Sequence, residues 1–171
     1  MDSTERTKYL SVIASQLRAA LPAGEDAVWQ AFIKAMSQAL DCEAASFFSV
    51  NDARRLLTLK FALGPSAKEI ANITFGYQGI VGAAAANRRS EISNDVSKDP
   101  DFCGKLDRAT GFKTKAVLCA PIIHAGDLLG VIELINPRCG AFTETDRELA
   151  DFLCIAVAKA VHDLRKATGT A

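Results

Sequence analysis

Residues 116–135 read AVLCAPIIHAGDLLGVIELI, and this stretch decides the fold class. Two apolar runs rich in β-forming residues, 116–123 and 128–135, flank the four residues from His124 to Asp127. Apolar runs of this length around a short turn are typical of a β-hairpin. Because both runs are apolar on both faces, we expect them to be the central strands of a sheet.

An alternating pattern upstream predicts a second antiparallel hairpin. In residues 57–63 leucine and phenylalanine alternate with other residues, and the short aromatic run 44–50 precedes a turn at residues 51–52. Two further short strands are expected at 73–75 and 90–92. These segments add four strands to the two of the first hairpin.

Three amphipathic helices surround the predicted strands. One spans residues 4–21 and is stopped by Pro22 and Gly24, and a second spans 25–40. A third begins at Thr143, placed three residues before Asp146 as in a capping box. Its expected inward face consists of Leu149, Phe152, Leu153, Ala156, Val157, Ala160, Val161 and Leu164.

Between the two hairpins lie a glycine-rich turn and a polar connection. The turn, Gly76 to Gly82, has three glycines and leads into the alanine run 83–86, which favours a short helix. Residues 94–114 are polar and predict a long loop with one or two helical turns. The order of elements indicates an α+β fold, with helices on one face and a small-molecule pocket under this loop on the other.

Composition narrows the class of protein. The 171 residues suit one domain, 49% of them are hydrophobic, and 20 basic residues balance 20 acidic ones, so we expect no nucleic acid or membrane partner. Residues 1–8 lack a signal peptide's apolar stretch, which favours a cytoplasmic location. The odd cysteine count without metal-type spacing predicts reduced, mostly buried thiols, at positions 42, 103, 119, 139 and 154.

Several ordered motifs across residues 25–165 together resemble the GAF domains, which are small-molecule-sensing modules. These motifs are Gly79-Ile-Val-Gly82, Ile92-Ser-Asn-Asp95, Asp101-Phe102, Asp107 to Thr114, Leu118 to Ile122, Gly130 to Asn136, and Phe142 before Asp146. The similarity is greatest to GAF domains of cyclic-nucleotide phosphodiesterases and adenylyl cyclases. It implies a six-stranded antiparallel sheet with the terminal helices on one face and a ligand pocket on the other.

The resemblance also implies a ligand site. By position, Asp107, Thr110, Thr114 and Glu133 match residues that contact the ligand in the cyclic-nucleotide-binding members. The turn Gly79, Ile80, Val81 matches the segment near the cyclic phosphate, and the free N–H groups of a helix N-terminus favour an anion there. The expected ligand is a small anion such as cyclic AMP or cyclic GMP, with no catalytic residue and no metal.

Two positions depart from the family's pattern. Its Asn-Lys-Phe-Asp-Glu signature has Pro137 in place of lysine and Arg147 in place of glutamate, so the lysine's ion pair to Asp146 is absent or supplied by Arg138. Where the family has a base-contacting aspartate near the end of the second strand, this chain has Ala62 and Leu63.

Structural roles are alternatives to ligand binding for the same polar residues. Asp107 and Thr110 are also typical caps of a helical turn, and Glu133 is also consistent with an exposed position on the sheet. His124 and His162 each lack a second ligand at metal spacing, which argues against metal or haem.

Three functions therefore compete. The first is the input module of a bacterial signal-transduction protein: residues 1–22 form a dimerising helix, 23–165 the GAF domain and 166–171 a tail before an output domain. The second is a GAF-fold free methionine sulfoxide reductase using Cys103, although the cysteine beside the glycine turn is missing. The third is a dimerisation module with a vestigial pocket. For the first, the helix at 4–21 predicts a homodimer whose seam includes Ile13 and Leu17.

Overall fold

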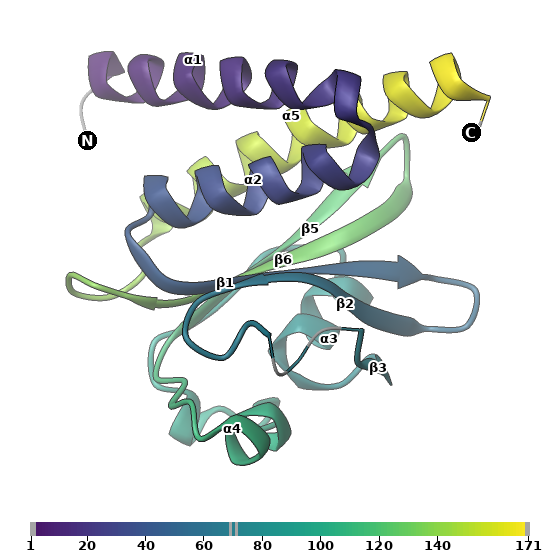
Figure 1. Ribbon diagram of the computed structural model, residues 1–171. Helices are drawn as coiled ribbons and strands as arrows, with labels where there is room; N and C mark the ends of the chain where they lie inside the picture. Colours follow the sequence, from purple (N-terminus) through teal and green to yellow (C-terminus); the bar gives the residue numbers. More distant parts are fainter. Residues whose placement is uncertain (1–2, 69, 71, 170–171) are drawn as a thin grey trace.

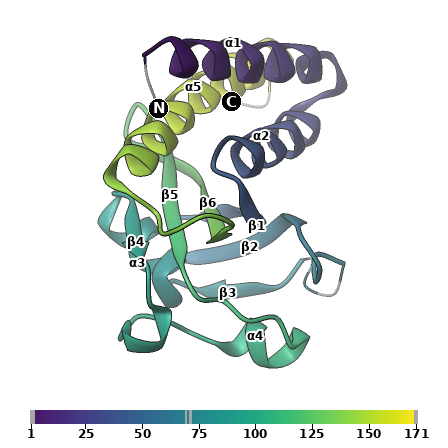
Figure 2. The ribbon, with the colours of Figure 1, turned by 90° about the vertical axis from the view of Figure 1, so that its left-hand side faces the viewer.

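The computed structural model describes residues 3–68, 70 and 72–169, and their secondary structure forms three layers (Figure 1). The helices are α1 (Ser3–Ala20), α2 (Glu25–Ala39), α3 (Gly79–Asn87), α4 (Lys105–Thr110) and α5 (Glu144–Thr168), with 3-10 turns at Leu21–Ala23 and Val96–Lys98. The strands are β1 (Cys42–Asn51), β2 (Leu56–Leu63), β3 (Thr74–Gly76), β4 (Glu91–Ser93), β5 (Val117–His124) and β6 (Asp127–Pro137). Helices α1, α2 and α5 lie on one side of the sheet, whereas α3 and α4 lie on the other (Figure 2).

All six strands form one sheet in the order β3-β2-β1-β6-β5-β4, and every neighbouring pair is antiparallel. The α+β class, the two hairpins and the six-stranded sheet are as expected. The expectation that both strands of the 116–135 hairpin are central is right for β6 and wrong for β5. Strand β6 pairs with β1, whereas β5 lies one strand from the edge because the three-residue β4 pairs along its outer side.

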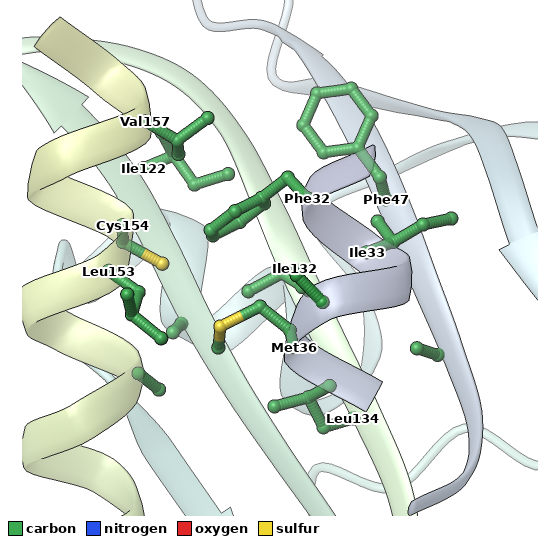
Figure 3. Packing of buried hydrophobic residues seen from close by; sticks show 14 of the residues in the cluster. Phe32, Ile33, Met36, Phe47, Ile122, Ile132, Leu134, Leu153, Cys154 and Val157 are labelled. Atoms are coloured by element: carbon green, nitrogen blue, oxygen red, sulfur yellow. The ribbon is translucent and has the colours of Figure 1, made fainter. Parts of the chain in front are cut away.

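The main core lies between the sheet and the three long helices. Trp29 of α2 stacks on Phe47 of β1 with ring centroids 4.2 Å apart. In Figure 3, Phe32 and Met36 project from α2 toward α5, next to Ile132 of the sheet. Both side chains are fully buried, and burying a side chain of this size stabilises the fold by about 1.5–3 kcal/mol.

The terminal helices are fixed by specific polar contacts. Thr143 and Asp146 form the predicted capping box at the start of α5. Near its other end, Arg165 donates two hydrogen bonds, of 2.8 and 2.7 Å, to the carboxylate of Glu25 at the start of α2. This ion pair lowers the pKa of Glu25, with the hydrogen bonds from Arg165 as the largest cause.

The departures from the family signature have a structural outcome at the end of β6. The carboxylate of Asp146 accepts a hydrogen bond from the hydroxyl of Thr143. Arg138 pairs with a different residue, since its Nε lies 3.5 Å from Asp41 Oδ1. Arg138 therefore does not take over the ion pair to Asp146 in this structure.

Two expectations about the helices are wrong. Phe152 is 55% exposed and Ala156 is exposed as well, because α5 buries the stripe through Leu149, Leu153 and Val157, and positions 152 and 156 face away from it. Ile13 and Leu17 are 3% and 6% exposed, so neither side chain is available on the surface of α1 to contact a second protomer. The chain reverses direction between α1 and α2, which lets α1 fold back and bury these two residues in the domain's own core.

Helix α5 continues to Thr168, into the segment expected as a tail, and residues 170–171 of that segment lie outside the described residues. Across the described residues, every helix is too short or too polar to traverse a lipid bilayer.

Candidate functional site

Two adjacent cavities lie on the side of the sheet opposite α1, α2 and α5. The larger, about 310 Å³, lies between the sheet, the glycine turn and α4, and the smaller, about 80 Å³, lies between the sheet, α4 and the end of β2. Both are roofed in part by the 94–114 segment, where the sequence predicted a pocket. The residues shared by the two cavities are Phe102, Cys103, Leu106 and Glu133.

All seven predicted site residues line these cavities, but in two groups. Gly79, Ile80 and Val81 line the larger cavity. Asp107, Thr110 and Thr114 line the smaller one, and Glu133 lines both. The seven predicted residues therefore lie in two adjacent cavities, and Glu133 is the predicted residue that both cavities share.

The glycine turn presents the N-terminus of α3 to the larger cavity. Its N-cap residue Gln78 makes no side-chain cap, and the first N–H groups of a helix have no partner within the helix. Lys105 lines the same cavity, with its Nζ 3.4 Å from the side-chain oxygen of Gln78. This wall thus combines backbone N–H donors with one cation, a combination that favours an anionic group.

Two glycines shape this turn. Gly79 has φ +73°, a backbone conformation that is strained for residues with a side chain. A Cβ at Gly82 would lie 2.4 Å from the carbonyl carbon of Tyr77. Only glycine lets the chain before α3 fold this tightly onto the helix.

Glu133 is a carboxyl group in an apolar setting. It lies on β6 opposite Ser46 of β1 and Cys119 of β5, and Cys119 Sγ lies 3.9 Å from its Oε1. The residue is half-buried, and its side chain lines both cavities. The alternative of an open position on the sheet is therefore not what the structure has.

Burial raises the pKa of Glu133 to about 7, and the negative charge of Asp107 adds to this effect. The hydrogen bond from Cys119 acts in the opposite direction but is weaker. Near neutral pH the carboxyl group is thus present in both forms. It can accept hydrogen bonds when ionised and donate one when protonated.

The polar residues around α4 are largely satisfied by one another. Asp107 accepts hydrogen bonds of 2.7 Å from both the backbone N–H and the hydroxyl of Thr114. The hydroxyl of Thr110 donates to the carbonyl of Leu106 and accepts from the N–H of Phe112. The capping alternative is wrong for both residues, because Gly104 is the N-cap of α4 and Asp107 and Thr110 lie inside the helix, where they form other local hydrogen bonds.

Sequence reasoning missed the apolar walls of the larger cavity. Phe48 and Phe75 line it from the sheet, with ring centroids 5.7 Å apart in an edge-to-face arrangement, and Phe102 and Leu106 line it from the loop side. The last two were detectable, because apolar residues within an otherwise polar loop need burial. Phe48 was not separable from core residues by pattern alone.

None of the cysteines in the described part of the chain is paired in a disulfide. Cys42, Cys119 and Cys154 are buried, Cys103 is partly buried and Cys139 is exposed. Among these same residues, no three His, Cys, Asp or Glu side chains gather as a metal-binding group.

A six-stranded antiparallel sheet with long helices on one face and two adjacent cavities on the other defines the class, an α+β domain. A family model described as "GAF domain" matches residues 25–161. The chain belongs to the GAF domain family.

Similar proteins support this assignment. The chain is 26% identical over 133 residues to a probable 3',5'-cyclic phosphodiesterase, pde-5, of Caenorhabditis elegans, which covers 72% of the chain and 18% of that protein. It is 36% identical over 101 residues to the cGMP-specific 3',5'-cyclic phosphodiesterase of Drosophila melanogaster, covering 57% of the chain and 9% of that protein. The chain thus spans less than a fifth of either relative.

Solved structures show the same fold. A GAF domain from a phosphoenolpyruvate-protein phosphotransferase of Coxiella burnetii matches with a TM-score of 0.83 at 20% identity, over 100% of both chains. A free methionine-R-sulfoxide reductase of Neisseria meningitidis matches with a TM-score of 0.75 at 20% identity, over 98% of this chain and 96% of that one.

Proposed function

We propose that this GAF domain is the small-molecule-sensing input module of a bacterial signal-transduction protein, and that its ligand is a cyclic nucleotide or a similar small anion. The observation that carries the proposal is the make-up of the larger cavity. The α3 N-terminus and Lys105 supply one wall suited to an anion, and Glu133 supplies a polar group on the sheet.

The apolar walls suit a flat ring. Phe48 and Phe75 provide aromatic surface for a purine, whose N–H groups are donors to an ionised carboxylate. A cyclic phosphate would take the N–H groups of Gly79, Ile80 and Val81. In this proposal the smaller cavity's polar residues hold α4 in place; they are Asp107, Thr110 and Thr114. They contact the ligand only if it extends from the larger cavity into the smaller one.

Calorimetry with cyclic GMP and cyclic AMP tests the cyclic-nucleotide ligand directly. We expect binding of at least one of them, a rise in melting temperature, and loss of binding when Lys105 is replaced by Glu. Lys113→Glu makes the same charge change at a residue that lines neither cavity and is the control. No heat and no thermal shift with either nucleotide would exclude them. Mass spectrometry of small molecules released from the purified protein then tests for another anion.

A redox enzyme of the same fold is the second candidate. The observation in its favour is that Cys103 lines both cavities, near Gly79. Against it, the glycine turn carries Ile80 and Val81 where those enzymes place a cysteine. We propose that the domain binds without catalysis, and turnover of free methionine sulfoxide with a thiol reductant, lost in Cys103→Ser, would overturn this.

The third candidate, a dimerisation module with a vestigial pocket, is disfavoured by a cavity of about 310 Å³ that is walled by both polar and aromatic residues. We propose that dimerisation accompanies ligand sensing: residues 1–22 and α5 form the interface, 23–165 the GAF domain, and an output domain belongs to the full-length protein. Because Ile13 and Leu17 are buried, we place the proposed dimer interface at other apolar side chains of these helices. These are the exposed Val12, Phe152 and Ile155.

A further inference from the structure

The turn between β5 and β6 is held from two sides. On one side, Arg88 Nη1 donates a 3.0 Å hydrogen bond to the carbonyl of Gly126. On the other side, the ring of His124 lies against the ring of His162 on α5, with centroids 4.2 Å apart and planes inclined by 31°. Sequence reasoning treated the two histidines separately, because 38 positions separate them along the chain. The fold makes them neighbours.

Arg88 also begins a polar network that reaches the larger cavity. Its Nη2 pairs with Asp52 Oδ2 at 2.5 Å, and the Tyr77 hydroxyl donates a 2.7 Å hydrogen bond to Asp52 Oδ1. The guanidinium of Arg55 lies 4.6 Å from the centre of the Tyr77 ring. Tyr77 directly precedes Gln78 and Gly79, which line the cavity.

Tyr77 is fixed as a hydrogen-bond donor. Burial raises its pKa to about 12, and the hydrogen bond to Asp52 and the negative charge of that residue add to the shift. The phenol therefore stays protonated at neutral pH. The close approach of Gly82 to Tyr77 means that this residue and α3 must move together.

Arg88 stands at the opposite end of the same helix. It is the C-cap residue of α3, with φ +53°. Both ends of α3 are thus tied to Asp52, one through Tyr77 and the other through Arg88. The network thus joins the chain before the glycine turn to the β5–β6 turn.

We propose that the Tyr77–Asp52–Arg88 network and the His124–His162 contact form one connection, through which the glycine turn of the larger cavity and helix α5 influence each other. A positive charge on the His162 ring weakens the connection at its contact with His124. The connection belongs to the free protein, and only its use in signalling rests on the proposed function. Its steps are two hydrogen bonds to Asp52, the hydrogen bond of Arg88 to Gly126, and the ring contact of the histidines.

The charges around the two rings define the pH range. Burial lowers the pKa of His162, and His124, Lys166 and Lys159 lower it further. Asp163 acts in the opposite direction but is hydrogen-bonded to Lys159. On the sheet side, Asp127 is the cross-strand partner of His124, and Arg88 reaches the adjacent Gly126.

The sign follows from the lowered pKa. The folded state resists protonation of His162 more than the unfolded state does, so the contact contributes its full stability above about pH 6.5, the ordinary value for histidine. That contribution is lost as the pH falls through the lowered pKa, when the His162 ring becomes charged.

NMR titration of the histidine rings in the ligand-free protein tests the connection. Tyr77→Phe removes only the hydroxyl that bonds Asp52, and we expect it to move the pKa of His162 by about 0.3 unit or more. Asp52→Asn is the second variant. Thr58→Val, which removes an exposed hydroxyl pair with Thr74 outside the network, is the control and should leave the titration unchanged.

Coupling is reciprocal, so the opposite experiment must also respond. At constant pH, His124→Gln should speed amide hydrogen exchange of residues 77–82 at least about twofold, while Ser97→Ala should not. The connection does not exist if Tyr77→Phe and Asp52→Asn leave the pKa of His162 at its wild-type value. It is equally excluded if His124→Gln leaves the amide hydrogen-exchange rates of residues 77–82 unchanged. Because no ligand is used, either result stands apart from the outcome of the nucleotide-binding test.

Discussion

The carboxylate of Asp107 binds both the backbone N–H and the hydroxyl of Thr114, at 2.7 Å each. The two residues thereby close the segment that follows α4 and hold the roof of the smaller cavity. The sequence predicted both as ligand contacts, whereas here Thr114 donates two hydrogen bonds to Asp107. The pair is also electrostatically linked to Glu133, whose pKa is raised in part by the charge of Asp107.

Replacing Asp107 by Asn should therefore have two effects. Loss of a charged acceptor for two hydrogen bonds should destabilise the domain by about 1–3 kcal/mol. Loss of the negative charge should lower the pKa of Glu133 from about 7. Denaturant unfolding measures the first effect, and NMR titration of the Glu133 carboxyl carbon measures the second. An unchanged Glu133 titration would show that the two carboxyl groups do not interact.

The Glu133 carboxyl group makes stability depend on pH. Its folded pKa, about 7, exceeds the ordinary value of 4.5, so the folded state holds the proton more tightly than the unfolded state. Relative to higher pH, this contribution is fully present below pH 4.5 and is lost as the pH rises through 7. Glu133→Gln, which is neutral at every pH, should remove this dependence and raise stability at pH 8 by about 2 kcal/mol.

Unfolding at pH 5 and pH 8 measures this difference for wild type and Glu133→Gln. The variant should differ little from wild type at pH 5, where the native carboxyl is protonated. Equal stability of the two proteins at pH 8 would contradict burial of an ionised carboxylate. The same variant should alter ligand affinity most at high pH, where the native residue is charged.

Asn136 shows how one side chain joins the loop to the sheet. Its Oδ1 accepts from the N–H groups of Lys115 and Ala116, and its Nδ2 donates to Glu43 and to the carbonyl of Lys113. The residue is buried and has φ +53°, a conformation that asparagine tolerates better than most residues.

Asn136→Ala should cost about 2–4 kcal/mol, since it leaves buried backbone N–H groups without partners. Asn136→Asp keeps the Oδ1 acceptor and should lose less when its added charge is neutralised at low pH. Chemical denaturation of both variants at pH 4 and pH 7 gives the comparison. Equal losses for both at pH 4 would mean that the Oδ1 hydrogen bonds contribute nothing.

Local signals in the sequence predicted most of the elements and part of the site. The Thr143–Asp146 capping box and the alternation in β2 depend on neighbours in the chain, and both were found. The carboxyl of Glu133 inside an apolar run was recognisable, because such a group needs a polar or solvent-filled environment. The glycine spacing likewise marked the turn at Gly79.

What the sequence could not show depends on contacts between distant segments. The ring contact between His124 and His162 arises only when α5 packs across the β5–β6 hairpin. Phe152 fits the helical period yet faces outward, because the width of the buried stripe is set by the sheet beneath it. The two hydrogen bonds that Thr114 donates to Asp107 depend on the loop's path, which propensities do not determine.

The proposed dimer makes the final prediction, and it separates two apolar surfaces of the terminal helices. Phe152 and Ile155 are 55% and 66% exposed on α5, so lysine at both positions should leave the fold intact and convert a dimer into monomers. Ile13 is 3% exposed in the core, so Ile13→Lys should unfold the domain rather than produce a folded monomer.

Sedimentation at about 100 μM, where an interface of micromolar Kd is mostly occupied, reports the oligomeric state, and circular dichroism reports folding. Lys159→Glu, which reverses a charge on the same helix and leaves both apolar side chains in place, is the control. A wild-type protein that is monomeric at this concentration, or a Phe152→Lys/Ile155→Lys variant that still dimerises, rules out the α5 surface as the seam.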